Sequence, residues 1–204
     1  EQLQAIRKTL VEEYHNLYIK ELDHFIDKVH IFKTHFAALD IRQDHSVHKR
    51  LVTEALRQKS IIKEDLGELD KDMLINCLLH EDIQLDPKDI DDPLLKDTLL
   101  NIRQLKAIQQ KNGESGCNRY IISNSEDIFS VLFVFGLFRW SGWDAEAITF
   151  DIVPLFETMN GMAASESVMQ ELFDLRVYRK HLENRKLTQT MMLGFSDGTK
   201  DGGY

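Results

Sequence analysis

Cysteine, positive charge and long apolar runs are all scarce in this 204-residue sequence, and each scarcity excludes a class of protein. The two cysteines, Cys77 and Cys117, are too few for a disulfide framework or a four-ligand zinc site, and they fit a reducing compartment. The 25 lysines and arginines are outnumbered by 34 aspartates and glutamates, so the formal net charge is −9. This balance argues against nucleic acid or an anionic membrane as the main partner, because both attract a basic surface.

No apolar segment has the length of a membrane span. The longest, residues 128–138, is shorter than the ~20 residues that cross a bilayer, and the first residues lack the pattern of a signal peptide. We therefore expect a soluble, cytoplasmic protein. Hydrophobic residues make up 43% of the chain, which is enough to build one or two packed domains and too many for a disordered tail.

Strand and helix patterns alternate along the chain. Apolar residues at spacings of three and four predict an amphipathic helix, or a close pair of helices, over about residues 1–33. Buried strands are predicted from short apolar runs at 36–41, 119–122, 147–156 and 190–195. Helices are predicted at about 47–59, 66–79, 94–110 and 128–140, and from the third strand to about 186. The Asp-rich stretch 81–97 is predicted to be a solvated loop.

These strands read as continuous apolar runs without a polar face, which is typical of a parallel sheet covered by helices. The fold class is therefore α/β and helix-rich. Two helix starts are also indicated: Asp44 or Ser46 can cap the helix that follows residue 46, and residues 123–126 have the spacing of a capping box. We expect the apolar helix at 128–140 to be a core element.

Each predicted strand ends in reactive or hydrogen-bonding side chains, and sites form at the carboxyl ends of the strands in barrels and open parallel sheets. We expect these ends to form one site from the following residues: Asp40, Arg42, Ser123, Glu157, Thr158, Ser196, Asp197 and Lys200. Glu157 and Asp197 are two carboxylates at neighbouring strand ends, which suits Mg²⁺. The alternative interpretation is that they cap helices.

The basic residues of this set also allow two interpretations. Arg42 is suited to hold a phosphate or carboxylate, or it forms a structural ion pair with Asp40 or Asp44. Lys200, in a Gly-rich turn, either reaches an anionic substrate or is simply solvated. His45 and His48 lie one helical turn apart, but because a third metal ligand is not evident nearby we expect surface or capping histidines.

Four motifs in order resemble the phosphoenolpyruvate carboxylase family. They are Leu-Asp-Ile-Arg-Gln at 39–43, Tyr-Ile-Ile-Ser at 120–123, Val-Pro-Leu-Phe-Glu-Thr at 153–158 and Gly-Phe-Ser-Asp-Gly-Thr-Lys-Asp at 194–201. The resemblance runs from the first predicted strand to the end of the chain. The family more usually has Tyr at Phe195 and Ser at Gly198, which puts hydrogen bonds from those side chains in doubt.

The resemblance implies an enzyme that carboxylates phosphoenolpyruvate with bicarbonate to give oxaloacetate and phosphate, with Mg²⁺ or Mn²⁺ as cofactor. It implies that Glu157 and Asp197 bind the metal, that Arg42 holds the substrate phosphate and that Lys200 is the lysine of the Ser-Asp-x-x-Lys-Asp turn. Both basic residues would thus bind substrate and take part in catalysis. The family forms homotetramers built on an eight-stranded α/β barrel surrounded by helices.

The chain would then be a single fragment, 1–204, of that catalytic barrel. It would supply a partial (β/α) barrel of about four parallel strands, with a helical excursion at about 60–111. A Thr-Ala-His-Pro-Thr segment is expected before residue 1 and a Gly-Arg-Gly-Gly loop after residue 204, so the chain alone should be inactive. Open strand edges and apolar surface around Phe133 and Phe135 predict self-association.

Two other functions fit parts of the pattern. A different Mg²⁺-dependent barrel enzyme that handles enolates would be favoured if the parent gene lacked both of those flanking motifs. A helical scaffold or interaction module would use the polar groups at the strand ends only as caps. Substituting Glu157 and Asp197 separates an enzyme from a scaffold, because only the enzyme would lose turnover.

Overall fold

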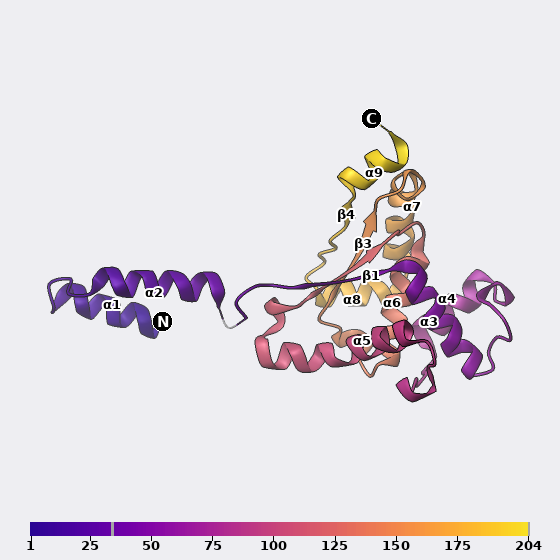
Figure 1. Cartoon of the computed structure of the whole chain (residues 1–204), viewed down its shortest axis with the longest axis horizontal. Helices are drawn as coiled ribbons and strands as arrows, with labels where there is room; N and C mark the ends of the chain where they lie inside the picture. Colours follow the sequence, from indigo (N-terminus) through magenta and orange to yellow (C-terminus); the bar gives the residue numbers. More distant parts are fainter. Residues whose placement is uncertain (34, 204) are drawn as a thin grey trace.

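The computed structural model describes residues 1–33 and 35–203 and contains a parallel sheet covered by helices (Figure 1). The four strands lie in chain order, with every neighbouring pair parallel. They are β1 (Asp40–Asp44), β2 (Arg119–Ser123), β3 (Asp151–Phe156) and β4 (Met192–Leu193). This order confirms the predicted α/β class and is the arrangement of part of a (β/α) barrel, in which each strand pairs with the next along the chain.

The central strands β2 and β3 are buried on both faces. Because successive side chains of a strand point to opposite faces, Tyr120 and Ile122 join the main core with Ile152 and Phe156 of β3. The other face carries a small separate cluster made by Ile121, Val153 and Leu155. Burial on both faces confirms the prediction of continuous apolar strands for this part of the sheet.

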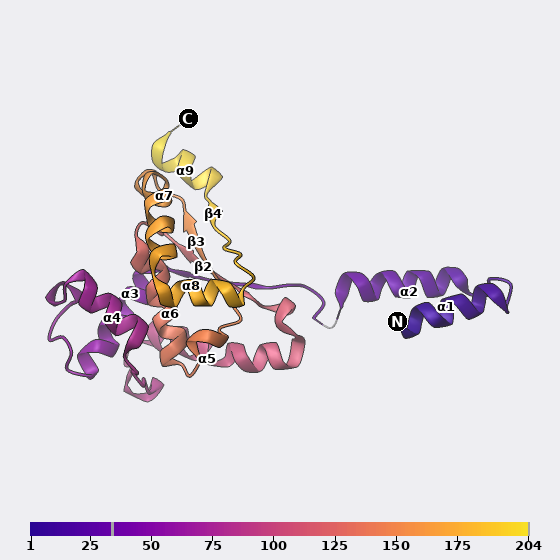
Figure 2. The same cartoon turned by 180° about the vertical axis from the view of Figure 1, so that it is seen from behind.

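The helices of the body, apart from the exposed helix at the end of the chain, build the main core against one face of these strands (Figure 2). The most buried is α6 (Ile128–Trp140), as its all-round apolar pattern predicts. Phe133 and Phe135 within it are buried, so the expected apolar surface around them is not there, because neighbouring helices cover it. The other helices of the body are α3 (His45–Gln58), α4 (Lys71–His80), α5 (Pro93–Asn112), α7 (Met159–Asp174), α8 (Arg176–Asn184) and α9 (Phe195–Gly202).

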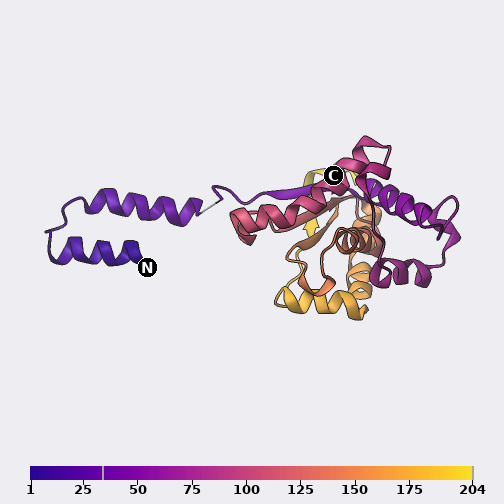
Figure 3. The same cartoon turned by 90° about the horizontal axis from the view of Figure 1, so that it is seen from below.

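The N-terminal segment is a hairpin of two helices, α1 (Gln2–Glu12) and α2 (Ile19–Phe32), that extends away from the body (Figures 1 and 3). This confirms the close helix pair allowed by the sequence. The two helices are joined by an ion pair in which Arg7 Nε lies 2.6 Å from Asp23 Oδ1. Ile26 is the buried residue of the pair, and the hairpin therefore contributes little to the core.

The first and last strands differ from their predicted positions. Only the last two residues of the predicted strand at 36–41 belong to the first strand: Phe36 and Leu39 are exposed, and β1 is the largely polar segment from residue 40 to residue 44. Its pairing comes from backbone hydrogen bonds to β2, with which it shares a five-residue register, and not from apolar content. The predicted strand at 190–195 shortens to Met192–Leu193, because Gly194 is followed by α9 and Phe195 is 92% exposed.

Three local predictions also need correction. Residues 147–150 do not belong to β3, which begins at Asp151 after a short 3₁₀ turn at Ala145–Ala147. The stretch 81–97 is not simply a solvated loop, since Ile83, Leu85 and Ile90 are buried and Pro93 already begins α5. The cap of α6 is Asp127, which accepts the Ser130 N–H at 3.1 Å, and not the pattern at 123–126.

The cap predicted at the start of α3 is confirmed. Asp44 Oδ1 accepts the backbone N–H of Ser46 at 2.8 Å. Across the described residues, every helix is too short or too polar to cross a membrane.

Candidate active site

One open cavity of about 520 Å³ lies at the carboxyl ends of the strands and the start of α9. Its lining comes from β1, from the end of β2 and the residue after it, from the segment after β3, and from α9: Arg42, Ser123, Asn124, Glu157, Thr158, Asp197, Lys200 and Asp201. The structure thus brings together the two predicted carboxylates and both predicted basic residues. Asp40 lies elsewhere, because it pairs with Arg119 (Oδ1 to Nε 3.1 Å) at the opposite end of β1.

Strand register explains why Arg42 and Glu157 meet. Arg42 lies in register with Ile121, which lies in register with Val153, and Glu157 follows Val153 by four residues along the chain. Alternation along the strand therefore directs these side chains to the same face as the small apolar cluster. The Arg42 Nη2 atom lies 3.5 Å from Glu157 Oε2.

Glu157 is the best-held side chain of the cavity. It is only 8% exposed, and its Oε1 accepts the backbone N–H of Asn124 at 2.8 Å. The close approach of the chain after β4 requires a glycine: a Cβ placed on Gly194 would lie 2.4 Å from the Cβ of Glu157. Gly194 also donates its N–H to the Phe156 carbonyl at 2.9 Å, which places the start of α9 beside Glu157.

Arg42 forms an ion pair, but not with the partners expected from the sequence. Its neighbours Asp40 and Asp44 have other partners, since Asp40 pairs with Arg119 and Asp44 caps α3. Burial raises the pKa of Asp44, but hydrogen bonds from Ser46 and Asn124 outweigh burial and hold that pKa below its ordinary value. The Arg42 side chain is 53% exposed, which leaves part of its guanidinium accessible to a ligand in the cavity.

Helix α9 supplies the second carboxylate and the lysine. Lys200 Nζ lies 3.0 Å from Asp197 Oδ1, one helical turn away. The hydrogen bond from Lys200 and its charge lower the pKa of Asp197, and the charge of Arg42 and a hydrogen bond with Glu157 add to the effect. Asp197 and Glu157 both line the cavity. Asp201 Oδ2 accepts the Met159 N–H at 2.8 Å and so fixes α9 against the start of α7.

The donor set fits a hard divalent cation. Two carboxylates that line one cavity repel each other when both are ionised, unless a proton or a cation lies between them. Mg²⁺ is commonly held by one or two carboxylates, with water and substrate oxygens in its remaining positions. Among residues 1–33 and 35–203, His, Cys, Asp and Glu do not form a group of three or more that could hold a metal ion. The pair therefore suits such a partly open site and not a closed zinc site.

The two histidines after β1 do not belong to the cavity. His48 is fully buried, with its Nε2 atom 2.9 Å from the Tyr120 hydroxyl, so the expectation of a surface or capping residue is wrong for it. His45 is half-buried and stacks on Phe133 at 5.6 Å between ring centroids. Desolvation by burial, together with the charge on His45, lowers the pKa of His48 to about 3.

Sequence reasoning missed Asn124, and it named Asp201 only as part of a motif. Asn124 directly follows the predicted strand end at Ser123, and after glycine, Asn and Asp are the residues that most readily adopt a left-handed conformation. An asparagine directly after a predicted strand was therefore the feature of the sequence that could have indicated this turn. Asp201 accepts a hydrogen bond from Met159, the first residue of α7, and not from a residue of its own helix. The spacing of the residues around Asp201 therefore does not predict this contact.

A family model and individual relatives of known name indicate the same family for this chain. A sequence model of the phosphoenolpyruvate carboxylase family matches residues 1–204. Phosphoenolpyruvate carboxylases from Gloeobacter violaceus and Prochlorococcus marinus are each 32% identical to this chain, over 91% and 99% of its length. That of Xanthomonas campestris pv. campestris is 35% identical over 86% of the chain. The chain spans about a fifth of the length of these relatives (20%, 21% and 19%).

Proposed function

Because this chain belongs to the phosphoenolpyruvate carboxylase family, we propose that it forms part of the active site of an enzyme that carboxylates phosphoenolpyruvate with bicarbonate. The observation that carries the proposal is the convergence of Arg42, Glu157, Asp197 and Lys200 on one cavity. These residues come from three separate parts of the sequence: β1, the position directly after β3, and α9. Two cations and two carboxylates are the groups that a phosphorylated carboxylic acid and a divalent cation require.

Arg42 and Lys200 are proposed to bind the anionic substrate. The chain carries a formal charge of −9, so a highly anionic substrate is repelled unless the cavity is locally basic. The guanidinium of Arg42 offers a planar pair of donors that matches a phosphate group. The Lys200 ammonium is 76% exposed and is free to exchange its contact with Asp197 for one with substrate.

Glu157 and Asp197 are proposed to hold Mg²⁺ or Mn²⁺ between them. Glu157 is fixed by its hydrogen bond from Asn124, while Asp197 sits on a short helix that is anchored through Asp201. When bound, such a cation stabilises negative charge that develops on a substrate oxygen. The two carboxylates thereby set where that stabilisation is available in the cavity.

The proposed reaction has two steps. A bicarbonate oxygen attacks phosphorus, and the bond from phosphorus to the enol oxygen breaks, giving carboxyphosphate and the enolate of pyruvate. The enolate carbon then attacks the carboxyl carbon, and phosphate leaves as oxaloacetate forms. Arg42 would orient the phosphate for the first step, and fixed positive groups around the cavity would stabilise the enolate oxygen in the second.

The 204 residues are proposed to be one part of the catalytic barrel, with residues 60–111 as a helical excursion. Since the chain spans about a fifth of its relatives, further residues of the active site are expected elsewhere in the full-length protein. The chain alone should then form no oxaloacetate. The full-length enzyme is proposed to be a cytoplasmic homotetramer that depends on no nucleic acid or membrane partner.

The test uses the full-length protein that contains this chain. Glu157→Gln and Asp197→Asn should each lower kcat for oxaloacetate formation by about 100-fold or more, because each removes one charge from the cation site. Glu166→Gln is the matched control, since Glu166 is exposed on α7 and lies outside the cavity. Full turnover by Glu157→Gln, with Mg²⁺ or Mn²⁺ dependence unchanged, would contradict the proposal.

A further inference from the structure

We propose that Asn124 is a positioning residue: its backbone amide fixes the rotation of the Glu157 carboxylate, and its side chain is locked in turn by Asp44. The inference rests on the proposed function, in which Glu157 holds a divalent cation. Asp44 is the last residue of β1, Asn124 follows β2 and Glu157 follows β3. The chain of hydrogen bonds from Asp44 through Asn124 to Glu157, called the relay below, therefore connects three strand ends.

The first step of the relay is a backbone conformation. Asn124 has φ +57°, in the left-handed region that most side chains avoid. This conformation turns the chain after β2 and aims the Asn124 N–H at Glu157 Oε1, 2.8 Å away. Since Glu157 is buried, a lost donor would leave one of its oxygens without that hydrogen bond in a place with little access to water.

The second step is the side chain of Asn124. Its Nδ2 donates to Asp44 Oδ2 at 2.5 Å. The other oxygen of Asp44, Oδ1, accepts the backbone N–H of Ser46 at 2.8 Å and its hydroxyl at 2.6 Å. Asp44 thus divides its two oxygens between the cap of α3 and Asn124, and the start of a helix holds the amide side chain in place.

The next residue prevents the turn from relaxing. Ser125 is buried, its N–H donates to the Leu155 carbonyl at 3.1 Å, and its hydroxyl donates to the Ile122 carbonyl at 2.9 Å. The Ser125 carbonyl also packs against Gly161 at the start of α7, where a Cβ would lie 2.6 Å from it. Asn124 is therefore anchored to β1 through its side chain and to β3 through its neighbour.

This arrangement gives Glu157 a fixed orientation before any ligand arrives. Residues that orient a metal ligand typically change metal affinity about 10–100-fold when they are replaced. A residue that served only to end β2 would change folding stability and leave cation affinity unaltered. Cation affinity therefore distinguishes the two roles.

The experiment measures Mn²⁺ affinity by electron paramagnetic resonance in the full-length protein, with thermal unfolding recorded in parallel. Asn124→Ala removes the side-chain lock and strains the left-handed turn, and it should raise the Mn²⁺ Kd by about tenfold or more. Asn124→Gly removes the lock but keeps φ near +57° without strain, so it folds like the parent and should raise the Kd by a smaller, measurable factor.

Asn16→Ala is the matched control. Asn16 also has a left-handed backbone, φ +64°, but it lies in the hairpin turn between α1 and α2. It should leave the Mn²⁺ Kd unchanged. An unchanged Kd in Asn124→Gly, with Mn²⁺ binding lost in Glu157→Gln, would overturn the positioning role and leave the proposed function standing. Unchanged Mn²⁺ binding in Glu157→Gln would overturn the proposed function itself.

Discussion

The two central strands and the two outer strands of the sheet are stabilised in different ways. In β2 and β3 the apolar side chains are buried on both faces of the sheet. In β1 four of the five side chains are polar and none is fully buried, and both residues of β4 are exposed. Packing therefore fixes the centre of the sheet, whereas backbone pairing and side-chain hydrogen bonds fix its edges.

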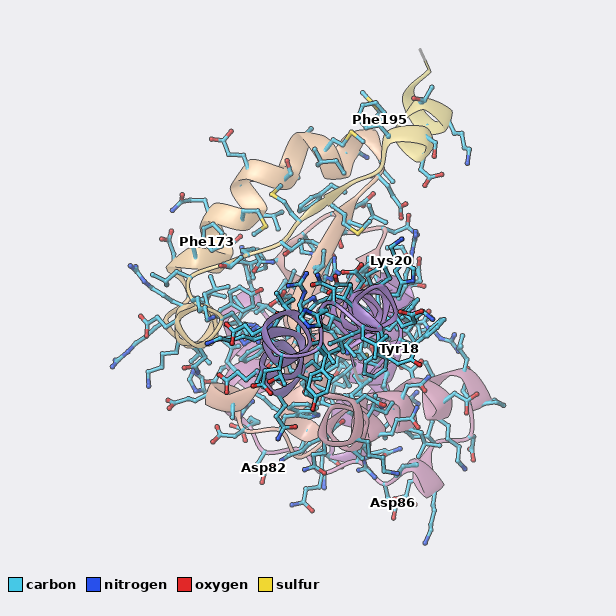
Figure 4. The ribbon with its side chains drawn as sticks, turned by 90° about the vertical axis from the view of Figure 1, so that its left-hand side faces the viewer. Tyr18, Lys20, Asp82, Asp86, Phe173 and Phe195 are labelled. Carbon is cyan, nitrogen blue, oxygen red and sulfur yellow. The ribbon has the colours of Figure 1, made fainter. Side chains whose placement is uncertain are left out.

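This difference divides the roles within the candidate site. Glu157 follows a central strand and is held rigidly, while Arg42 on β1 and Lys200 after β4 are both more than half exposed. The exposed Phe195 at the start of α9 lies near the top of the view in Figure 4, with Asp82 and Asp86 near the bottom. The buried carboxylate provides a fixed point, and the exposed cations are free to adjust to substrate.

The sharpest test of the comparison is a pair of residues that face each other in register. Phe156 on β3 is fully buried and lies opposite Leu193 on β4, which is 61% exposed. Phe156→Ala should cost about 3–5 kcal/mol in the free energy of unfolding, because it leaves a cavity in the core. Leu193→Ala should cost less than about 0.5 kcal/mol. Urea unfolding checks both, and equal losses would show that β4 is packed as tightly as β3.

The second prediction concerns pH and the histidine beneath β2. His48 has a folded-state pKa of about 3, below its ordinary value, so its contribution to stability is complete above about pH 6.5 and is lost as the pH falls toward 3. The free energy of unfolding should drop by roughly 2 kcal/mol between pH 7 and pH 5 from this group alone. Urea midpoints across that range measure the loss.

His48→Gln is the control for the pH effect. Glutamine does not titrate in this range but can still form a hydrogen bond with the Tyr120 hydroxyl. Its acid sensitivity should be smaller than that of the parent, with the remainder from other buried groups such as His181, whose pKa is lowered to about 4 by burial and the charge of Arg185. Equal pH dependence in both proteins would show that His48 does not carry the effect.

The third prediction compares two glycines near the outer edge. Gly194→Ala places a methyl group against the Cβ and backbone of Glu157, so it should cost about 1–3 kcal/mol and also weaken Mn²⁺ binding. Gly198→Ala clashes only with the flexible end of Met162, and its Cβ would lie at an ordinary 3.8 Å from the Glu157 carbonyl oxygen, so it should cost less, without a change in Mn²⁺ affinity. Similar effects from both substitutions would contradict the claim that Gly194 is required by its contact with Glu157.

The sequence allowed good predictions where packing dominates. The strand at Arg119–Ser123 and the helix at Ile128–Trp140 were recognised because their apolar patterns reflect their burial. The same reasoning misplaced β1, whose polar residues pair through the backbone, and it treated Phe195 as part of a strand although that residue begins α9. Apolar content alone does not distinguish an exposed phenylalanine from a buried one.

The candidate site was predicted in part for a related reason. Arg42, Glu157, Asp197 and Lys200 could be proposed because each lies near a predicted strand end, and all four line the cavity. The role of Asn124 depends on a backbone angle and on the contact with Asp44, 80 residues away in the chain. An asparagine after a strand can suggest the left-handed turn, but no local pattern predicts the contact with Asp44, so the role of Asn124 required the structure.

The most direct test of the central claim is a double-mutant cycle on Mn²⁺ affinity in the full-length protein, using Glu157→Gln, Asp197→Asn and the double variant. If the two carboxylates hold one cation together, each single variant should lose most of the affinity, and the double variant should bind only slightly more weakly than either, with a coupling of about 1 kcal/mol or more. Independent, additive losses, or Mn²⁺ binding equal to the parent in both single variants, would contradict the account.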